Sequence, residues 1–287
     1  MKLARSVNAA RAEVGNAHDH GSSIGLVPTL GALHEGHVSL MRRARAVCDV
    51  VAVSIFVNPL QFGPHEDLEA YPRDEQRDAT IAKGAGADLL FIPPPEEMKM
   101  DDLSMKISAG SPANVLEGAL RPGHFSGVCT VVAKLFNILQ PQLAFFGQKD
   151  AQQNAVLTGM VTDLDFPVGL IVCPTVRESD GLALSSRNLF LTEAERARAA
   201  VLFRALDAGR DVLSRSGDIE RCEAAMAQAL TLESHVTVDY ARAVDPLTFE
   251  TPSERADILL VVAARVGRTR LIDNMLVEGR SMKGRRS

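Results

Sequence analysis

Residues 24–37 read IGLVPTLGALHEGH, a short apolar run followed by a turn-rich stretch with two histidines. The segment 35–47, which begins inside this stretch, has the apolar spacing of an amphipathic helix. An apolar strand that ends in a glycine-containing turn and leads into a helix is the first half of a βαβ unit. Residues 24–47 therefore predict a buried strand, a loop and a crossover helix.

The same alternation continues along the first 175 residues. Nearly continuous apolar runs, typical of parallel strands buried on both faces, occur at 24–27, 50–57, 89–92, 143–146 and 168–172. Helical patterns of crossover length lie at 35–47, 67–84, 127–139 and 150–163. This order predicts an α/β protein whose Rossmann-like domain, residues 1–175, contains a doubly wound parallel sheet.

The pattern changes after Val176. Thr192 and Glu195 have the spacing of a capping box, which predicts a helix from there to about residue 214. A second helical pattern covers 219–232, and strand-like runs follow at 236–244, 258–266 and 269–272. Helices followed by strands predict a second, smaller α+β domain over residues 176–287.

Composition narrows the class of protein. The 287 residues carry 31 Lys and Arg against 36 Asp and Glu, a net charge of −5, so the chain lacks the positive field of a nucleic-acid binder. No apolar run reaches the ~20 residues of a membrane span, and the N-terminus lacks a secretory signal. A short basic tail at 283–286 is expected to be solvated. We expect a cytoplasmic protein with neither nucleic-acid nor membrane partners.

The four cysteines are far apart in the sequence and show no C-x-x-C spacing. They are Cys48, Cys129, Cys173 and Cys222. This pattern predicts reduced thiols rather than disulfides or a zinc site.

His34 and His37 are the first candidates for chemistry. They lie three residues apart where a helix is expected to begin, so they can share one helix face. The backbone N–H groups of such a loop and helix start form an anion site, and imidazoles there can donate hydrogen bonds to phosphate. Two alternatives stay open: half of a metal site, for which no third ligand has suitable spacing, and two solvated surface histidines.

Three further segments follow expected strands or the domain boundary. Asn58 and Gln61 follow the run at 50–57, and the neutral Gln61 amide can bind a hydroxyl or carboxylate. Lys149 follows the run at 143–146 and offers a point charge to phosphate, with Gln153 on the same helix face. The segment 185–187, Ser-Ser-Arg, offers hydroxyls and a guanidinium. Taken alone, each could also be a loop cap, a solvated turn or an exposed loop.

Six motifs occur in order along essentially the whole chain. They are HEGH at 34–37, FVNPLQF at 56–62, YPR at 71–73, LEG at 116–118 with RPGHF at 121–125, FGQKD at 146–150 with Gln152 and Gln153, and DGLALSSRN at 180–188. In this combination the chain resembles the pantoate–β-alanine ligase (pantothenate synthetase) family, within the H-x-G-H nucleotidylyltransferase superfamily.

The resemblance implies a function. It is the ATP-dependent condensation of pantoate with β-alanine, through an enzyme-bound pantoyl adenylate, to give pantothenate, AMP and pyrophosphate, a step toward coenzyme A. It further implies ATP as substrate, Mg²⁺ bound with ATP rather than in a fixed protein site, a homodimer, and a second domain that closes over the phosphates. Gly181 lies just past the expected domain boundary and can absorb the backbone change of such a lid; the alternative is that it forms a static turn and that Arg187 is a permanent part of the pocket. The alternatives are a nucleotidylyltransferase acting on a phosphorylated acceptor and an ATP-binding regulatory module without turnover.

The resemblance also assigns site residues. Catalytic roles fall to His37, His34 and Lys149. Pantoate and β-alanine contacts fall to Gln61, Gln153 and Asn58. ATP contacts fall to Leu30, Gly31, Ala32, Leu33, His34, Glu35, Gly36, His37, Gly147, Gln148, Lys149, Asp150, Val176, Leu184, Ser185, Ser186 and Arg187. Leu30 stands where the family usually has Met, a swap of similar volume. Gln148 stands where it often has Glu, which removes one charge near the phosphates.

Overall fold

The computed structural model describes residues 1–64, 66–253 and 257–278, so the basic tail at 283–286 lies outside the described residues. Contacts divide the chain into two compact units. The first contains Met1–Gln148 and Val156–Val176, and the second contains Lys149–Ala155 and the chain from Arg177 onward. Among the described residues, no helix combines the length and the apolar composition that a membrane span requires.

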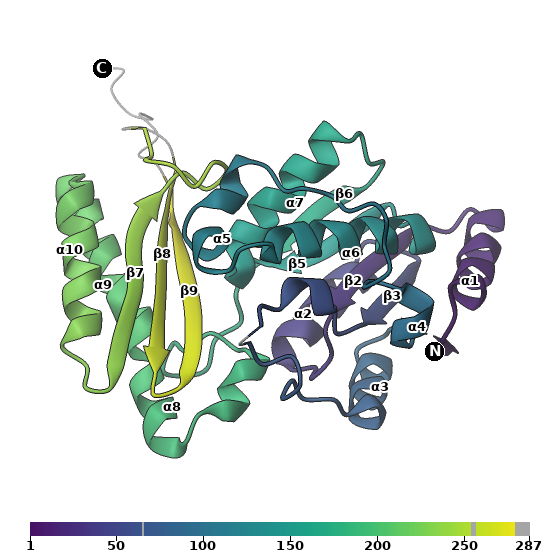
Figure 1. Ribbon diagram of the computed structural model, residues 1–287, viewed down its shortest axis with the longest axis horizontal. Helices are drawn as coiled ribbons and strands as arrows, with labels where there is room; N and C mark the ends of the chain where they lie inside the picture. Colours follow the sequence, from purple (N-terminus) through teal and green to yellow (C-terminus); the bar gives the residue numbers. More distant parts are fainter. Residues whose placement is uncertain (65, 254–256, 279–287) are drawn as a thin grey trace. The chain divides into compact units, whose positions relative to one another are not determined.

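The first unit is built on a six-stranded parallel sheet with the order β1-β4-β3-β2-β5-β6 (Figure 1). The strands are β1 (Lys2–Ala4), β2 (Ile24–Thr29), β3 (Val50–Ile55), β4 (Leu89–Phe91), β5 (Leu143–Gly147) and β6 (Gly169–Cys173). Its main helices are α1 (Val7–Asp19), α2 (Glu35–Arg45), α3 (Glu75–Gly84), α6 (His124–Leu139) and α7 (Ala151–Asp163). The first five residues of α7 cluster with the second unit. Four shorter helices are α4 (Pro95–Met98), α5 (Glu117–Leu120), η1 (Pro59–Gln61) and η2 (Ser111–Asn114). The predicted doubly wound fold is confirmed.

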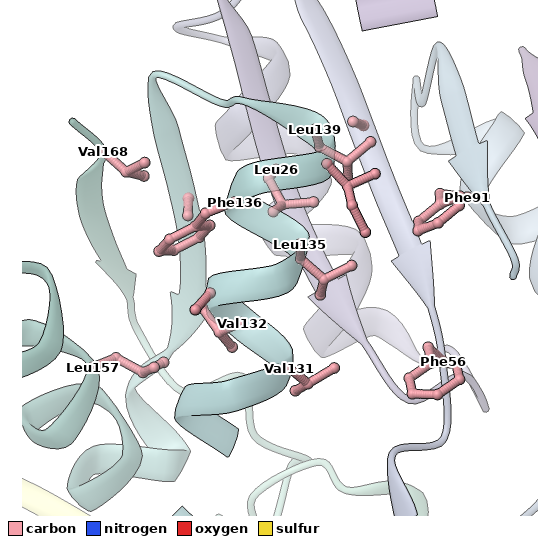
Figure 2. Packing of buried hydrophobic residues seen from close by; sticks show 14 of the residues in the cluster. Leu26, Phe56, Phe91, Val131, Val132, Leu135, Phe136, Leu139, Leu157 and Val168 are labelled. Atoms are coloured by element: carbon pink, nitrogen blue, oxygen red, sulfur yellow. The ribbon is translucent and has the colours of Figure 1, made fainter. Parts of the chain in front are cut away.

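Successive residues of the central strands bury on opposite faces of this sheet. Leu26 of β2 packs in one core with α1 and α6, whereas its neighbour Val27 packs in a second core with α2 and α3. Figure 2 shows Leu135 and Leu139 of α6 beside Leu26 and Phe91 in the first of these cores. This two-sided burial explains why the strands read as continuous apolar runs.

The strand order places a ligand-binding position between β2 and β5. The chain builds outward from β2 through β3 to β4, then returns to the other side of β2 with β5 and β6. Open parallel sheets bind ligands at the carboxyl ends of strands where the order reverses in this way. The loop after β2 and residues 147–148 at the end of β5 therefore lie at the same edge of the sheet.

Some expected boundaries were wrong. The helix expected from residue 67 begins at Glu75, because Pro72 disfavours a helical residue before it and Asp74 caps α3 by accepting from Arg77 N. The strand β1 and the helix α1 had no corresponding expectation. The strand expected at 269–272 continues to Val277.

The second unit is a separate α+β arrangement. Its antiparallel sheet, in the order β7-β8-β9, consists of β7 (Val236–Val244), β8 (Ile258–Val266) and β9 (Thr269–Val277). Helices α9 (Val201–Ser216) and α10 (Ile219–Thr231) pack on one face. The predicted capping box at Thr192 and Glu195 is present, and it opens α8 (Glu193–Ala199). The helix expected to about residue 214 is interrupted at Ala200, which caps both α8 and α9.

Candidate active site

The loop between β2 and α2 is held from beneath by a buried carboxylate. Asp78 of α3 is only 1% exposed, and its two oxygens accept hydrogen bonds of 2.8 Å from the backbone N–H groups of Ala32 and Leu33. Gly31 has φ +92°, and a Cβ there would lie 3.1 Å from Asp78 Oδ2. Burial raises the pKa of Asp78, and the two backbone hydrogen bonds oppose that rise. The carboxylate therefore fixes the conformation of the loop that leads into His34.

The two histidines cap α2 with their side chains. His34 is the N-cap residue, and its Nδ1 accepts the N–H of Gly36 at 3.1 Å. His37 Nδ1 accepts the N–H of His34 at 3.3 Å, so the pair forms a reciprocal capping box. The ring centroids lie 4.1 Å apart. Since both Nδ1 atoms are acceptors, each neutral imidazole carries its proton on Nε2.

This geometry corrects the expected anion site. The N–H groups of Gly31, Ala32, Leu33 and His34 all donate to protein acceptors, namely Thr29 Oγ1, Asp78 and His37 Nδ1. The expectation that these amides face a ligand is wrong, because Asp78, 45 residues away in sequence, occupies two of them. These loop amides are therefore engaged within the protein, and both imidazoles turn Nδ1 toward the backbone.

The hydrogen bonds around Asn58 determine how Gln61 is oriented. The buried Asn58 accepts the N–H of Leu60 at Oδ1, at 3.2 Å, and donates from Nδ2 to the carbonyl of Gly127, at 3.1 Å. The same Nδ2 lies 3.1 Å from Gln61, which must present its acceptor Oε1. The Gln61 side chain therefore directs Oε1 at Asn58 and its donor, Nε2, away from Asn58.

The segment after β5 contains the candidate cation. Gly147 ends β5, and Gln148–Asp150 forms the short helix η3. The Lys149 side chain is 19% exposed, and its Nζ lies 3.7 Å from Asp150 Oδ1. Within the second unit, Asn274 of β9 donates from Nδ2 to the carbonyl of Lys149 at 2.9 Å. Gln153 lies one turn further along, in α7.

The Ser-Ser-Arg segment opens the helix η4 (Ser186–Phe190). Ser185 is the N-cap residue, and its Oγ accepts the N–H of Arg187 at 3.3 Å. Ser186 is buried, and Leu184 and Arg187 are half-buried. The serine that was expected to serve as a phosphate ligand therefore also has a structural role as a cap.

The turn before this segment is fixed by a buried ion pair. Arg177 contacts both oxygens of Asp273, at 2.6 and 3.0 Å, and donates to the carbonyl of Gly181 at 3.0 Å. The guanidinium also lies 4.7 Å from the ring centroid of Phe203. Gly181 has φ +92°, and a Cβ there would lie 2.1 Å from Phe203. Gly181 therefore forms a packed turn, and we place no hinge at it.

Among the candidates of the first unit, the structure brings two groups together. The rings of His34 and His37 are in contact at the start of α2, and Asn58 and Gln61 are hydrogen-bonded to each other. Between α2 and α3, a cavity of about 310 Å³ is lined by Leu33, His34 and Glu35 among others, but His37 is not part of its lining. Lys149, Gln153 and the segment 185–187 belong to the second unit. Within the described ranges, no group of three His, Cys, Asp or Glu side chains is placed to hold a metal ion.

Sequence reasoning assigned no role to several residues that hold the site. Asp78, Asn274 and Asp273 belong to other elements and become neighbours only through the fold. Arg121 and His124 were also given no role. Their place in the RPGHF motif at 121–125, which the family resemblance includes, was the one sequence signal that pointed to them.

Comparison with known proteins identifies the family. The family model described as pantoate-beta-alanine ligase matches residues 2–276. A pantothenate synthetase from Moorella thermoacetica is 50% identical over 281 residues, 97% of this chain and 99% of its own length. One from Lysinibacillus sphaericus is 48% identical over 278 residues, 96% of this chain and 98% of its own length.

Solved structures of the same family are similar to this chain over nearly its whole length. The crystal structure of pantothenate synthetase from Thermus thermophilus has a TM-score of 0.91 and 45% identity, covering 96% of this chain and 99% of that chain. The Francisella tularensis pantoate-beta-alanine ligase, described as complexed with beta-gamma ATP and beta-alanine, has a TM-score of 0.79 and 36% identity over 96% of this chain and 97% of its own. These matches do not favour the alternative of a nucleotidylyltransferase with a phosphorylated acceptor. The chain belongs to the pantoate–β-alanine ligase family.

Proposed function

We propose that this chain condenses pantoate with β-alanine at the expense of ATP, which is converted to AMP and pyrophosphate. The observation that carries the proposal is the capping of α2 by its own imidazoles. Because His34 and His37 both accept backbone N–H groups at Nδ1, their Nε2–H groups are oriented donors at the carboxyl end of β2. Family membership and the ATP and beta-alanine complex of the Francisella relative support the assignment of substrates.

In the first step, a carboxylate oxygen of pantoate attacks the α-phosphorus of ATP, and the bond to the pyrophosphate oxygen breaks. Negative charge grows on the leaving pyrophosphate, and neutral imidazole donors become more favourable partners as it grows. We assign this stabilisation to His37 and His34 through Nε2–H, with Lys149 as the point charge. Such preorganised donors need no rearrangement during the reaction.

The acid substrate is held by amides. With its Oε1 held by Asn58, the Gln61 side chain offers its Nε2–H₂ group to the carboxylate or a hydroxyl of pantoate. Gln153 supplies a second neutral amide. Neutral donors orient the carboxylate without the strong ion pair that would lower its nucleophilicity.

In the second step, the β-alanine amine attacks the acyl carbon of the adenylate. The carbon–nitrogen bond forms, the bond to the AMP oxygen breaks, and the nitrogen loses a proton to give the amide. The protein's task is again to hold the two reactants in line.

We assign the nucleotide contacts to segments 30–37, 147–150 and 184–187 together with Val176. In this proposal the second domain acts as a lid that brings Ser185, Ser186 and Arg187 to the phosphates. Magnesium bound with ATP would supply neutralisation of the phosphate charge. A magnesium ion of this kind needs only one or two protein carboxylates, and Asp150, 50% exposed beside Lys149, is suited to that role.

We also propose a cytoplasmic homodimer that forms through the first unit. The edge strand β6 supports this, because its Val172 is 43% exposed. Sedimentation at micromolar concentration is expected to give a dimer-sized species, and a purely monomeric protein would reject this proposal.

The activity is tested by measuring AMP formation with each substrate omitted in turn. We expect AMP release to require ATP, pantoate and β-alanine together at steady state. A regulatory nucleotide-binding module predicts ATP binding without AMP, and a nucleotidylyltransferase predicts turnover that is independent of β-alanine. Either result would reject the proposed function.

A further inference from the structure

The backbone carbonyl of Gln61 receives two side-chain hydrogen bonds from residues about sixty positions later. His124 Nδ1 lies 2.7 Å from this oxygen, and Arg121 Nη2 lies 3.3 Å from it. His124 is the first residue of α6, and Arg121 follows α5. The short helix η1 that carries Gln61 is therefore fastened to the start of α6.

The hydrogen bonds determine the tautomer of His124. The Arg121 guanidinium has only donors, and its Nη1 lies 3.1 Å from His124 Nε2, which must therefore accept. The Gln61 carbonyl has only acceptors, so Nδ1 must donate. His124 is thus a neutral imidazole with its proton on Nδ1. Burial, followed by the charge of Arg121, lowers the pKa of His124 to about 4, which agrees with this state.

Arg121 is in turn held by a carboxylate. Its Nε donates to Glu66 Oε1 at 2.7 Å, and its Nη2 contacts the other oxygen of Glu66. Both side chains are largely buried, so this two-bond contact is stronger than an exposed ion pair. Glu117 is the remaining charged group that acts on His124. Glu66, Arg121, His124 and the Gln61 carbonyl thus form one continuous chain of hydrogen bonds.

Packing reinforces the same junction. A Cβ on Gly127 of α6 would lie 2.3 Å from the carbonyl oxygen of Leu60, so only glycine allows α6 to approach η1 this closely. The Gly127 carbonyl also accepts from Asn58, which holds the Gln61 side chain. The start of α6 therefore fixes Gln61 twice, at its backbone and, through Asn58, at its amide.

We propose that His124 is a positioning residue for the acid-binding amide, holding the Gln61 carbonyl through Nδ1–H so that the Gln61 side chain faces pantoate. Arg121 and Glu66 set the orientation and tautomer of the ring. This inference rests on the proposed function, in which Gln61 binds the acid. In this proposal His124 acts on the acid only through Gln61, so its loss is expected to affect the acid site and to leave the ATP site intact.

Two variants separate this role from a structural one. His124→Ala removes the donor to Gln61, whereas in His124→Asn the amide nitrogen can take the place of Nδ1. We expect His124→Ala to raise KM for pantoate about tenfold, the effect of one hydrogen bond of typical net strength, with KM for ATP changed less than about twofold. His124→Asn should recover most of that loss.

A matched control lies at the C-cap of α1. His20 Nδ1 lies 2.7 Å from the carbonyl of Asn16, the same type of bond on an exposed helix end. His20→Ala should leave both KM values unchanged. The proposal is overturned if His124→Ala raises both KM values equally or neither, or if His124→Asn behaves like His124→Ala.

A second readout needs no activity and no variant. The ¹⁵N shifts of the His124 ring at neutral pH should show a protonated Nδ1 and an unprotonated Nε2, and the reverse pattern would overturn the proposal. Absence of pantoate-dependent turnover in the unaltered protein would instead reject the proposed function, so the two failures are distinguishable.

Discussion

The Oδ1 atom of Asp78 accepts a hydrogen bond of 2.8 Å from the backbone N–H of Leu33, one residue before the first histidine of the H-x-G-H motif. Its second oxygen makes an equal bond to Ala32, a non-glycine residue with φ +50°. A residue outside the motif thus determines the conformation of the loop that presents the motif.

Replacing Asp78 by Asn should destabilise the protein. An amide has only one acceptor oxygen, and its NH₂ group would face a backbone N–H, so one buried bond is lost at a cost of roughly 1–3 kcal/mol. Urea unfolding measures this loss. Glu75→Gln is the control. Glu75 lies on the same helix as Asp78 and forms an exposed ion pair with Arg5, so its replacement should cost less than about 1 kcal/mol. Equal midpoints for the two variants would contradict the role of Asp78.

His37→Ala should abolish adenylate formation while the fold remains intact. Loss of one preorganised donor to a developing charge lowers kcat by roughly 10²–10³. Pyrophosphate release in a single turnover with ATP and pantoate is the measurement, and circular dichroism checks the fold. Folded His37→Ala with near-normal turnover would show that the Nε2–H group has no part in the step.

His124 should make stability depend on pH below neutrality. Its pKa is about 4 in the folded protein against 6.5 for an unperturbed histidine, so the unfolded chain takes up the proton first as the pH falls. The stabilisation is complete above pH 6.5 and is lost progressively down to pH 4, about 3 kcal/mol in all at roughly 1.4 kcal/mol per pKa unit. Chemical unfolding between pH 4 and 7 should show this loss, and His124→Asn should lack it. Identical pH slopes would refute the assignment.

Gly181→Ala should destabilise the second unit, because a Cβ would lie 2.1 Å from Phe203 and the φ of +92° is unfavourable for alanine. We expect roughly 1–3 kcal/mol from the steric conflict alone. Gly217→Ala is the control, since Gly217 also has a positive φ, +70°, but no atom within 4 Å of its Cβ position. Thermal unfolding compares the two. If Gly181→Ala is as stable as Gly217→Ala, the turn at Gly181 can move to accommodate the added Cβ, which is the behaviour of a hinge and would contradict the packed turn.

The sequence predicted the sheet because burial on both faces makes its strands, such as β2 and β3, visible as apolar runs. It also predicted where His34, Gln61 and Lys149 lie, because each follows a strand. It could not predict that Asp78 satisfies the loop amides, or that Asn58 orients the Gln61 amide. These contacts join residues that share no periodic pattern, and only the folded chain brings them together.

The most direct test of the proposed reaction follows the oxygen atoms. Pantoate labelled with ¹⁸O in both carboxylate oxygens is incubated with ATP and β-alanine, and the products are analysed by mass spectrometry. Attack of the carboxylate on the α-phosphorus predicts one ¹⁸O in AMP and one in the amide carbonyl of pantothenate. AMP without label, or label in orthophosphate together with ADP, would contradict a pantoyl adenylate and with it the function proposed for this chain.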